Sequence, residues 1–142
     1  MKILSKKEIK KIEALIKTQF NVDYKFEDIV LKDNKDKLYL LSRDFKNVDV
    51  KLRINSLGLY FGKLHHGRVR LSIEGSQLVK GKKNVIEIKD SDAKKWLRGE
   101  ELKTEENIKG FVIIKNKDDY LGCGEVKDKK ILNYIAKDRR IR

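Results

Sequence analysis

The stretch that decides the fold of the first half of this chain is LYFGKLHHGRVRLSI, residues 59–73. Two segments rich in β-branched and aromatic residues, 59–64 and 68–73, flank His65-His66-Gly67. A glycine at the third position can supply the positive φ that a tight turn needs, so the pattern predicts a β-hairpin. Arg68 and Arg70 alternate along the second strand and therefore point to one side of it.

The residues around this hairpin predict an α+β unit with an antiparallel sheet. Ser5 and Glu8 have the spacing of a capping box, and the isoleucines that follow recur at helical intervals. A second hairpin is expected over residues 28–43, with its turn at 33–36, and a half-buried strand over 48–54. Residues 74–79 are expected to form a short helix or turn.

The second half reads as one strand, one helix and a β-meander. The polar break at 81–84 suggests a boundary between a domain at 1–81 and a domain at 82–142. A strand is expected at 85–88, then a short helix capped by Asp90 and closed by Gly99. Strands follow at 110–115, 120–126 and 130–135. A small, mostly-β barrel would hide the edges of such a set.

The charge balance favours a polyanionic partner. The 142 residues include 35 Lys+Arg and 22 Asp+Glu, which gives a net charge of +13. Only two histidines and one cysteine are present, which argues against most metal sites and most nucleophilic mechanisms. No apolar run approaches the ~20 residues of a membrane span, so we expect a cytoplasmic protein without a membrane partner.

Two motifs carry a resemblance to known families. The run Gly58 to Lys63, with Phe61-Gly62-Lys63 at its end and Arg70-Leu71 downstream, resembles the pre-PUA signature of Nip-seven-type ribosome-biogenesis factors of archaea and eukaryotes. In that family an α/β pre-PUA domain precedes a PUA domain. The glycine-rich run 121–124 resembles the corresponding strand of the PUA domain.

The second half also resembles the PUA tail of Sun-family rRNA cytosine-5 methyltransferases. The matching segments are 97–102, 121–124 and 130–134, and Ala136 replaces a proline typical of that tail. Both resemblances imply RNA recognition. Neither implies catalysis by this chain, which has no G-x-G-x-x-G after a first strand and no methyltransferase domain.

The resemblance places RNA on the face formed by the short helix and the final strand. The candidate RNA-binding residues there are Arg98, Gly99, Lys127, Lys129, Lys130, Lys137, Arg139 and Arg140. The secondary candidates are Lys63, Arg68, Arg70 and Tyr134. Gly99 would permit close backbone approach, and Tyr134 would either pack in the barrel or stack on a base. For any single lysine, ordinary solubilising charge is the better explanation, whereas the cluster near the C-terminus favours binding.

Other conspicuous residues have simpler structural interpretations. His65 and His66 are adjacent on a turn and point apart, so we expect no metal site, and no cofactor is expected either. Cys123 between two glycines suggests a buried small side chain, and Trp96 suggests core. Gly122 and Gly124, two apart, are expected to share one face of a curved strand.

The sequence therefore favours a non-catalytic RNA-binding protein that acts on rRNA or tRNA in ribosome biogenesis, or as an adaptor for an rRNA-modification enzyme. One alternative is a protein–protein docking module for a biogenesis factor or methyltransferase, with little RNA affinity of its own. An exposed apolar patch on residues 1–81 would favour that alternative. A small nuclease would instead need a carboxylate cluster and a divalent metal.

Overall fold

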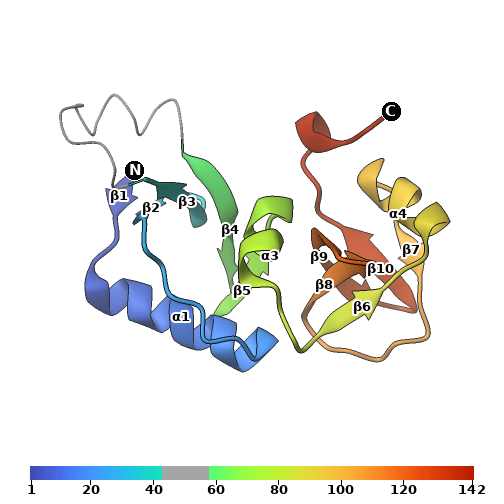
Figure 1. Ribbon diagram of the computed structural model, residues 1–142, viewed down its shortest axis with the longest axis horizontal. Helices are drawn as coiled ribbons and strands as arrows, with labels where there is room; N and C mark the ends of the chain where they lie inside the picture. The colour runs from blue at the N-terminus through green and yellow to red at the C-terminus, as the bar shows by residue number, and fades with distance from the viewer. Residues whose placement is uncertain (43–57) are drawn as a thin grey trace.

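The computed structural model describes residues 1–42 and 58–142 as an α+β protein with two five-stranded sheets, three helices and one 3-10 turn (Figure 1). The strand expected at 48–54 lies outside the described residues. Within the described part of the chain, no helix has the length and apolar character needed to cross a membrane.

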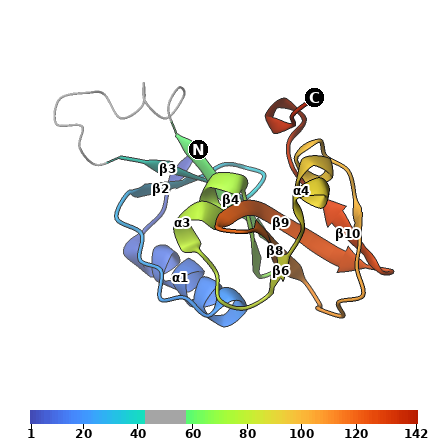
Figure 2. The same ribbon diagram turned by 45° about the vertical axis from the view of Figure 1, so that its right-hand side comes forward.

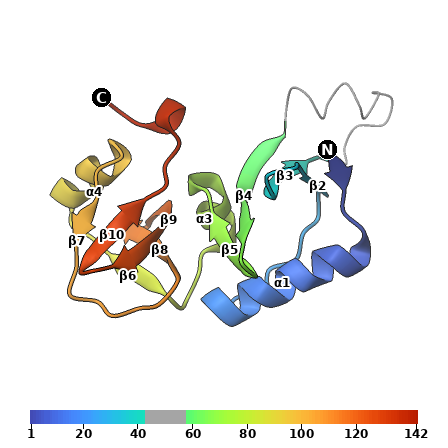
Figure 3. The same cartoon turned by 180° about the vertical axis from the view of Figure 1, so that it is seen from behind.

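The first sheet is antiparallel throughout and has the strand order β1-β2-β3-β4-β5. Its strands are β1 (Lys2–Ile3), β2 (Ile29–Lys32), β3 (Lys37–Leu41), β4 (Leu59–His65) and β5 (Arg68–Leu71). Helix α1 (Lys6–Phe20) runs below this sheet, and α3 (Ile73–Val79) follows β5 and stands between the two sheets (Figures 1 and 3).

The capping box predicted at the start of α1 is present. The Ser5 hydroxyl accepts a hydrogen bond from the Glu8 amide at 3.2 Å, and the Glu8 carboxylate accepts one from the Ser5 amide at 3.1 Å. The Lys2 ammonium donates to the same carboxylate and, with these bonds, lowers the pKa of Glu8 to about 2. The face carrying Ile12 and Ile16 is buried, as the helical spacing predicted.

The hairpin predicted from residues 59–73 is confirmed. His66 and Gly67 both have positive φ, 50° and 73°, which is the geometry of a two-residue turn whose twist suits a hairpin. The register pairs Lys63 with Arg70 and His65 with Arg68.

The outer edge of β5 is covered by side chains from other elements. Gln19 of α1 donates to the Val69 carbonyl at 3.0 Å and accepts from the Val69 amide at 2.6 Å. The Cys123 sulfur accepts from the Leu71 amide at 3.3 Å. These contacts satisfy backbone groups that would otherwise leave a strand edge open to further pairing.

The second sheet has the order β6-β8-β9-β10-β7. Its strands are β6 (Val85–Glu87), β7 (Leu102–Lys103), β8 (Phe111–Asn116), β9 (Asp119–Lys127) and β10 (Lys130–Asn133), with helix α4 (Asp90–Leu97) after β6 and the 3-10 turn η1 (Lys137–Arg139) after β10. Strand β6 pairs in parallel with β8, whereas the other pairs are antiparallel. The meander was predicted, but the parallel pair and the two-residue strand β7 were not.

One local expectation in this half was wrong, and the strand β9 is less regular than expected. Asp90 does not cap α4: it is the first helical residue, and its carboxylate instead accepts hydrogen bonds from Asn116 and Lys117. Gly122 has a φ of 85° and lies at a register shift between β8 and β9, so the strand does not alternate regularly there as the sequence suggested. A side chain at Gly122 would meet Ile73, whereas one at Gly124 would meet Trp96.

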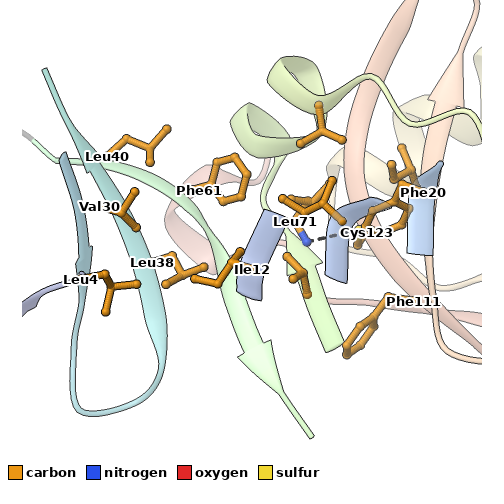
Figure 4. Close-up of a cluster of buried hydrophobic side chains, with 14 residues drawn as sticks. Leu4, Ile12, Phe20, Val30, Leu38, Leu40, Phe61, Leu71, Phe111 and Cys123 are labelled. Atoms are coloured by element: carbon orange, nitrogen blue, oxygen red, sulfur yellow. Dashed lines mark hydrogen bonds between the residues drawn. The ribbon is translucent and has the colours of Figure 1, made fainter. Parts of the chain in front are cut away.

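The two halves are joined by a common hydrophobic cluster, shown in Figure 4. It runs from Leu4 and Val30 through Phe61 and Leu71 to Phe111 of the second sheet. Helix α3 packs against both β4 and β9 (Figure 2). The amides of residues 82 and 83 also donate to the carbonyl at the end of α1. The domain boundary after residue 81 stays a prediction, and this core draws on residues from both sides of it.

Candidate nucleic-acid interface

One group of candidate residues lies at the turn between β9 and β10. Lys130 pairs in register with Lys127 of β9 on one side and with Lys103 of β7 on the other. All three are exposed, and Lys129 stands beside them in the turn, with a φ of 62°. We call Lys103, Lys127 and Lys130 the lysine row.

The lysine row disfavours folding. Like charges directly opposite one another on neighbouring strands repel, so the fold alone gives no reason to place three there. Lys103 was not among the candidates predicted from the sequence, because β7 is only two residues long and its partner β10 lies more than 25 residues further along the chain. Nothing in the local pattern reveals that register.

A second group lies at the other end of β10, in the C-terminal segment and at the end of α4 (Figure 1). The Arg140 Nε donates to the Ile135 carbonyl at 3.0 Å, and the side chain fills the space that a Cβ on Gly99 would need. Gly99 has a φ of 92°, as its predicted role in closing the helix requires. Its open side therefore receives Arg140, rather than being left free for RNA.

The other members of this group differ in how much they are engaged. Arg139 forms an ion pair with Glu74 at the start of α3. Arg98 ends α4 and lies 3.9 Å from the Glu100 carboxylate. Lys137 is exposed. The eight principal candidates therefore do not form one patch: they divide into two groups separated by the length of β10.

The secondary candidates meet where the two sheets adjoin. Lys63 and Arg70 are cross-strand neighbours, and Arg68 lies on the same face, as the alternation predicted. The Arg70 guanidinium carbon stands 4.1 Å from the centre of the Tyr134 ring and 5.9 Å from that of Phe111. The structure thus brings Arg70 and Tyr134, which are far apart in the sequence, into a stacked pair.

Arg70 and Tyr134 line a cleft of about 420 Å³, which we call the Tyr60–Tyr134 cleft. One wall is made by β3, β4 and β5, and carries Tyr39 and Tyr60, with ring centres 5.6 Å apart. The opposite wall is made by β9 and residues 134–139, and the start of α3 completes the lining.

The phenol groups in this cleft are held neutral. Burial is the main reason why the pKa of Tyr134 is raised to about 12. The second reason is a hydrogen bond of 2.8 Å that the Tyr134 hydroxyl donates to Glu125. Burial also raises the pKa of Tyr60, against the opposing effect of the Arg70 charge. Both rings therefore stay uncharged over the physiological range and can stack on planar groups.

The other residues singled out in the sequence have structural roles. Cys123 is buried, which raises the pKa of its thiol to about 12, and Trp96 is buried and donates to the Leu121 carbonyl at 2.8 Å. His65 and His66 do not point apart as expected, because their ring centres lie 4.2 Å apart in an edge contact. Residues 1–42 and 58–142 hold no group of three or more His, Cys, Asp or Glu arranged to bind a metal ion.

Comparison with known proteins identifies the second half. Residues 83–141 match the family model described as Methyltransferase RsmF PUA domain. No curated protein matches the chain. The match confirms the predicted resemblance of this half to a methyltransferase PUA tail, and gives no support to the Nip-seven-type resemblance. The second half of the chain therefore has the character of a PUA domain, an RNA-binding module.

Proposed function

We propose that this protein is a non-catalytic RNA-binding protein that recognises folded rRNA or tRNA through the basic surface of its PUA half. Its cellular role would lie in ribosome biogenesis, or in guiding a separate rRNA-modification enzyme to its substrate, and its place of action would be the cytoplasm. The observation that carries the proposal is the match of residues 83–141 to the family model described as Methyltransferase RsmF PUA domain.

The lysine row supports this proposal physically. Three ammonium groups on adjacent strands form a compact cationic surface that can neutralise phosphates and release their counterions. The net charge of +13 adds long-range attraction to any polyanion. Contacts of this kind recognise backbone and shape more than base sequence, as is common for proteins that bind folded RNA.

The proposal is tested by the affinity of the purified protein for fluorescent rRNA fragments and for DNA duplexes of matched length, measured across a range of salt concentrations. We expect tighter binding to the structured RNA. A variant with Lys127, Lys129 and Lys130 changed to Gln should bind more weakly, with a shallower dependence on salt. The turn is a better target than the C-terminal segment, where Arg139 and Arg140 also hold the fold together.

Weak binding that is equal for RNA and DNA, and unaffected by this variant, would refute the proposal. The docking-module alternative would then take its place. Among the described residues of the first half, the exposed large apolar side chains lie on separate elements: Met1 and Ile3 at β1, Leu59 at the start of β4 and Leu78 in α3.

A further inference from the structure

The Tyr60–Tyr134 cleft has the size and lining of a site for a small planar group. Its volume of about 420 Å³ lies within the range of roughly 300–1,000 Å³ that is usual for small-ligand sites. It is formed by segments from both halves of the chain, whose shared hydrophobic cluster fixes one wall relative to the other.

The lining combines aromatic rings with one stacked guanidinium. Tyr39 and Tyr60 stand on the wall of the first sheet, and Tyr134, with 37% of its surface exposed, stands on the other. Arg70 lies against the Tyr134 ring and presents a second planar surface. Aromatic rings and guanidinium planes are the groups on which unstacked nucleobases stack in single-stranded RNA complexes.

The charges around the cleft suit an anionic strand. Lys37 on β3 and Arg70 on β5 line the cleft with cations. Among the described residues, no carboxylate forms an ion pair with Arg70. Arg139 and Glu74 also line the cleft but neutralise each other in an ion pair. This leaves the cations Lys37 and Arg70 against the single carboxylate of Asp138 among the lining residues.

The position of the cleft connects it to the cationic surface already described. Its second wall begins at Tyr134, directly after β10, and the lysine row crosses the other end of the same strand. A nucleic-acid strand lying along β10 would therefore contact the lysine row with its phosphates and reach the cleft with a base.

We propose that the Tyr60–Tyr134 cleft receives one unstacked nucleobase of the bound RNA, which extends the stack formed by the Tyr134 ring and the Arg70 guanidinium. This inference rests on the proposed RNA-binding function and deepens it, because it adds recognition of a base at the junction of the two halves. Since every base has a π-face, the site would prefer single-stranded segments without demanding one sequence.

The test uses the full chain and two fluorescent probes: an oligouridylate of about twelve nucleotides, and the same strand carrying abasic sites throughout. The wild-type protein should bind the strand with bases roughly 5- to 150-fold more tightly than the abasic strand. Tyr134→Leu should remove this preference by lowering the affinity for the strand with bases toward that for the abasic strand. Tyr134→Phe keeps the ring and should keep the preference.

Arg70→Lys provides a second, independent variant, because it keeps the charge and loses the planar stacking surface. It should reduce the preference for the strand with bases and leave the salt dependence unchanged. Circular dichroism and thermal melting of each variant establish that the fold is intact before affinities are compared.

The outcomes separate the two proposals. If both strands bind equally to the wild type, or if Tyr134→Leu keeps the preference, the cleft proposal is overturned while RNA binding through the lysine row stands. If neither strand nor any structured RNA binds even at low salt, both proposals fail together. Loss of the preference in Tyr134→Leu, with its retention in Tyr134→Phe, supports the assignment.

Discussion

Removing the lysine row should weaken RNA binding and stabilise the fold at the same time. Changing Lys103, Lys127 and Lys130 to Gln keeps three long polar side chains on the same strands and removes their charges. In the structure, Lys130 faces a lysine on each side, so two like-charge cross-strand pairs disappear. A side chain that served only the fold would not be expected to improve stability when it is lost.

The size of both effects follows from this geometry. Cross-strand pairs change stability by roughly 0.2–1 kcal/mol each, and exposure to water and salt places these pairs near the lower end. Two pairs give a gain of about 0.5 kcal/mol at low ionic strength, which corresponds to a rise in Tm of roughly 1–3 °C. Each lysine that contacts a phosphate adds about 0.7–0.9 to the slope of log K against log salt, so the slope should fall by about 2 to 3.

The assay combines thermal melting at low salt with RNA-binding titrations at several salt concentrations. The matched control changes three exposed lysines of α1, Lys7, Lys10 and Lys11, to Gln, which removes the same charge from a different surface. The control should leave the salt slope near that of the wild type. A lower Tm in the lysine-row variant, or a slope equal to that of the control, would refute the reasoning.

Three further predictions concern the fold that holds this surface. In Gly124→Ala the new methyl group would lie 2.7 Å from the Trp96 ring, so we expect the free energy of unfolding to fall by about 1–3 kcal/mol. Urea unfolding, followed by the fluorescence of the single tryptophan, measures this loss. An unchanged midpoint would contradict the close packing at Gly124. Cys123 should react with a thiol reagent only after unfolding, because burial raises its pKa to about 12, and rapid labelling of the native protein would be inconsistent with that burial. Glu8 should contribute stability above pH 4.5 that is lost as the pH falls toward about 2, because its pKa is lowered in the folded state. In Glu8→Gln the melting temperature should therefore depend less on pH over that range than in the wild type.

The features that could be predicted from the sequence are those set by neighbours along the chain. Ser5 and Glu8 meet within one helical turn, and His66 and Gly67 adopt positive φ within a single hairpin. Both need only local geometry, so residue type and spacing were sufficient. The same holds for the β-meander, whose strands are separated by short polar turns.

The features that escaped prediction depend on contacts between distant segments. The sequence predicted that Asp90 caps a helix, but its carboxylate instead accepts hydrogen bonds from Asn116 and Lys117, which lie far along the chain. The register shift near Gly122 moves the residues that follow it to the opposite face of β9 from the one that regular alternation predicts. The sequence pattern alone does not show where such a shift occurs. The assignment of the candidate RNA-binding residues stays a prediction, but the sequence suggested one cluster, because it does not show that β10 separates them into two groups.

The division of the basic residues changes what the surface can recognise. A single cluster of charge would hold an RNA backbone in many orientations. Two sites at the two ends of β10 would fix both the position and the direction of a bound RNA strand. For this to work the ends must not move relative to each other. Lys130 of the lysine row begins β10 and Tyr134 directly follows its last residue. Arg70 reaches Tyr134 from the first sheet, and the hydrogen bond between Leu71 and Cys123 joins β5 to β9. In the proposed complex the first half of the chain would therefore complete the surface of the PUA half, by supplying the Arg70 guanidinium that stacks on Tyr134.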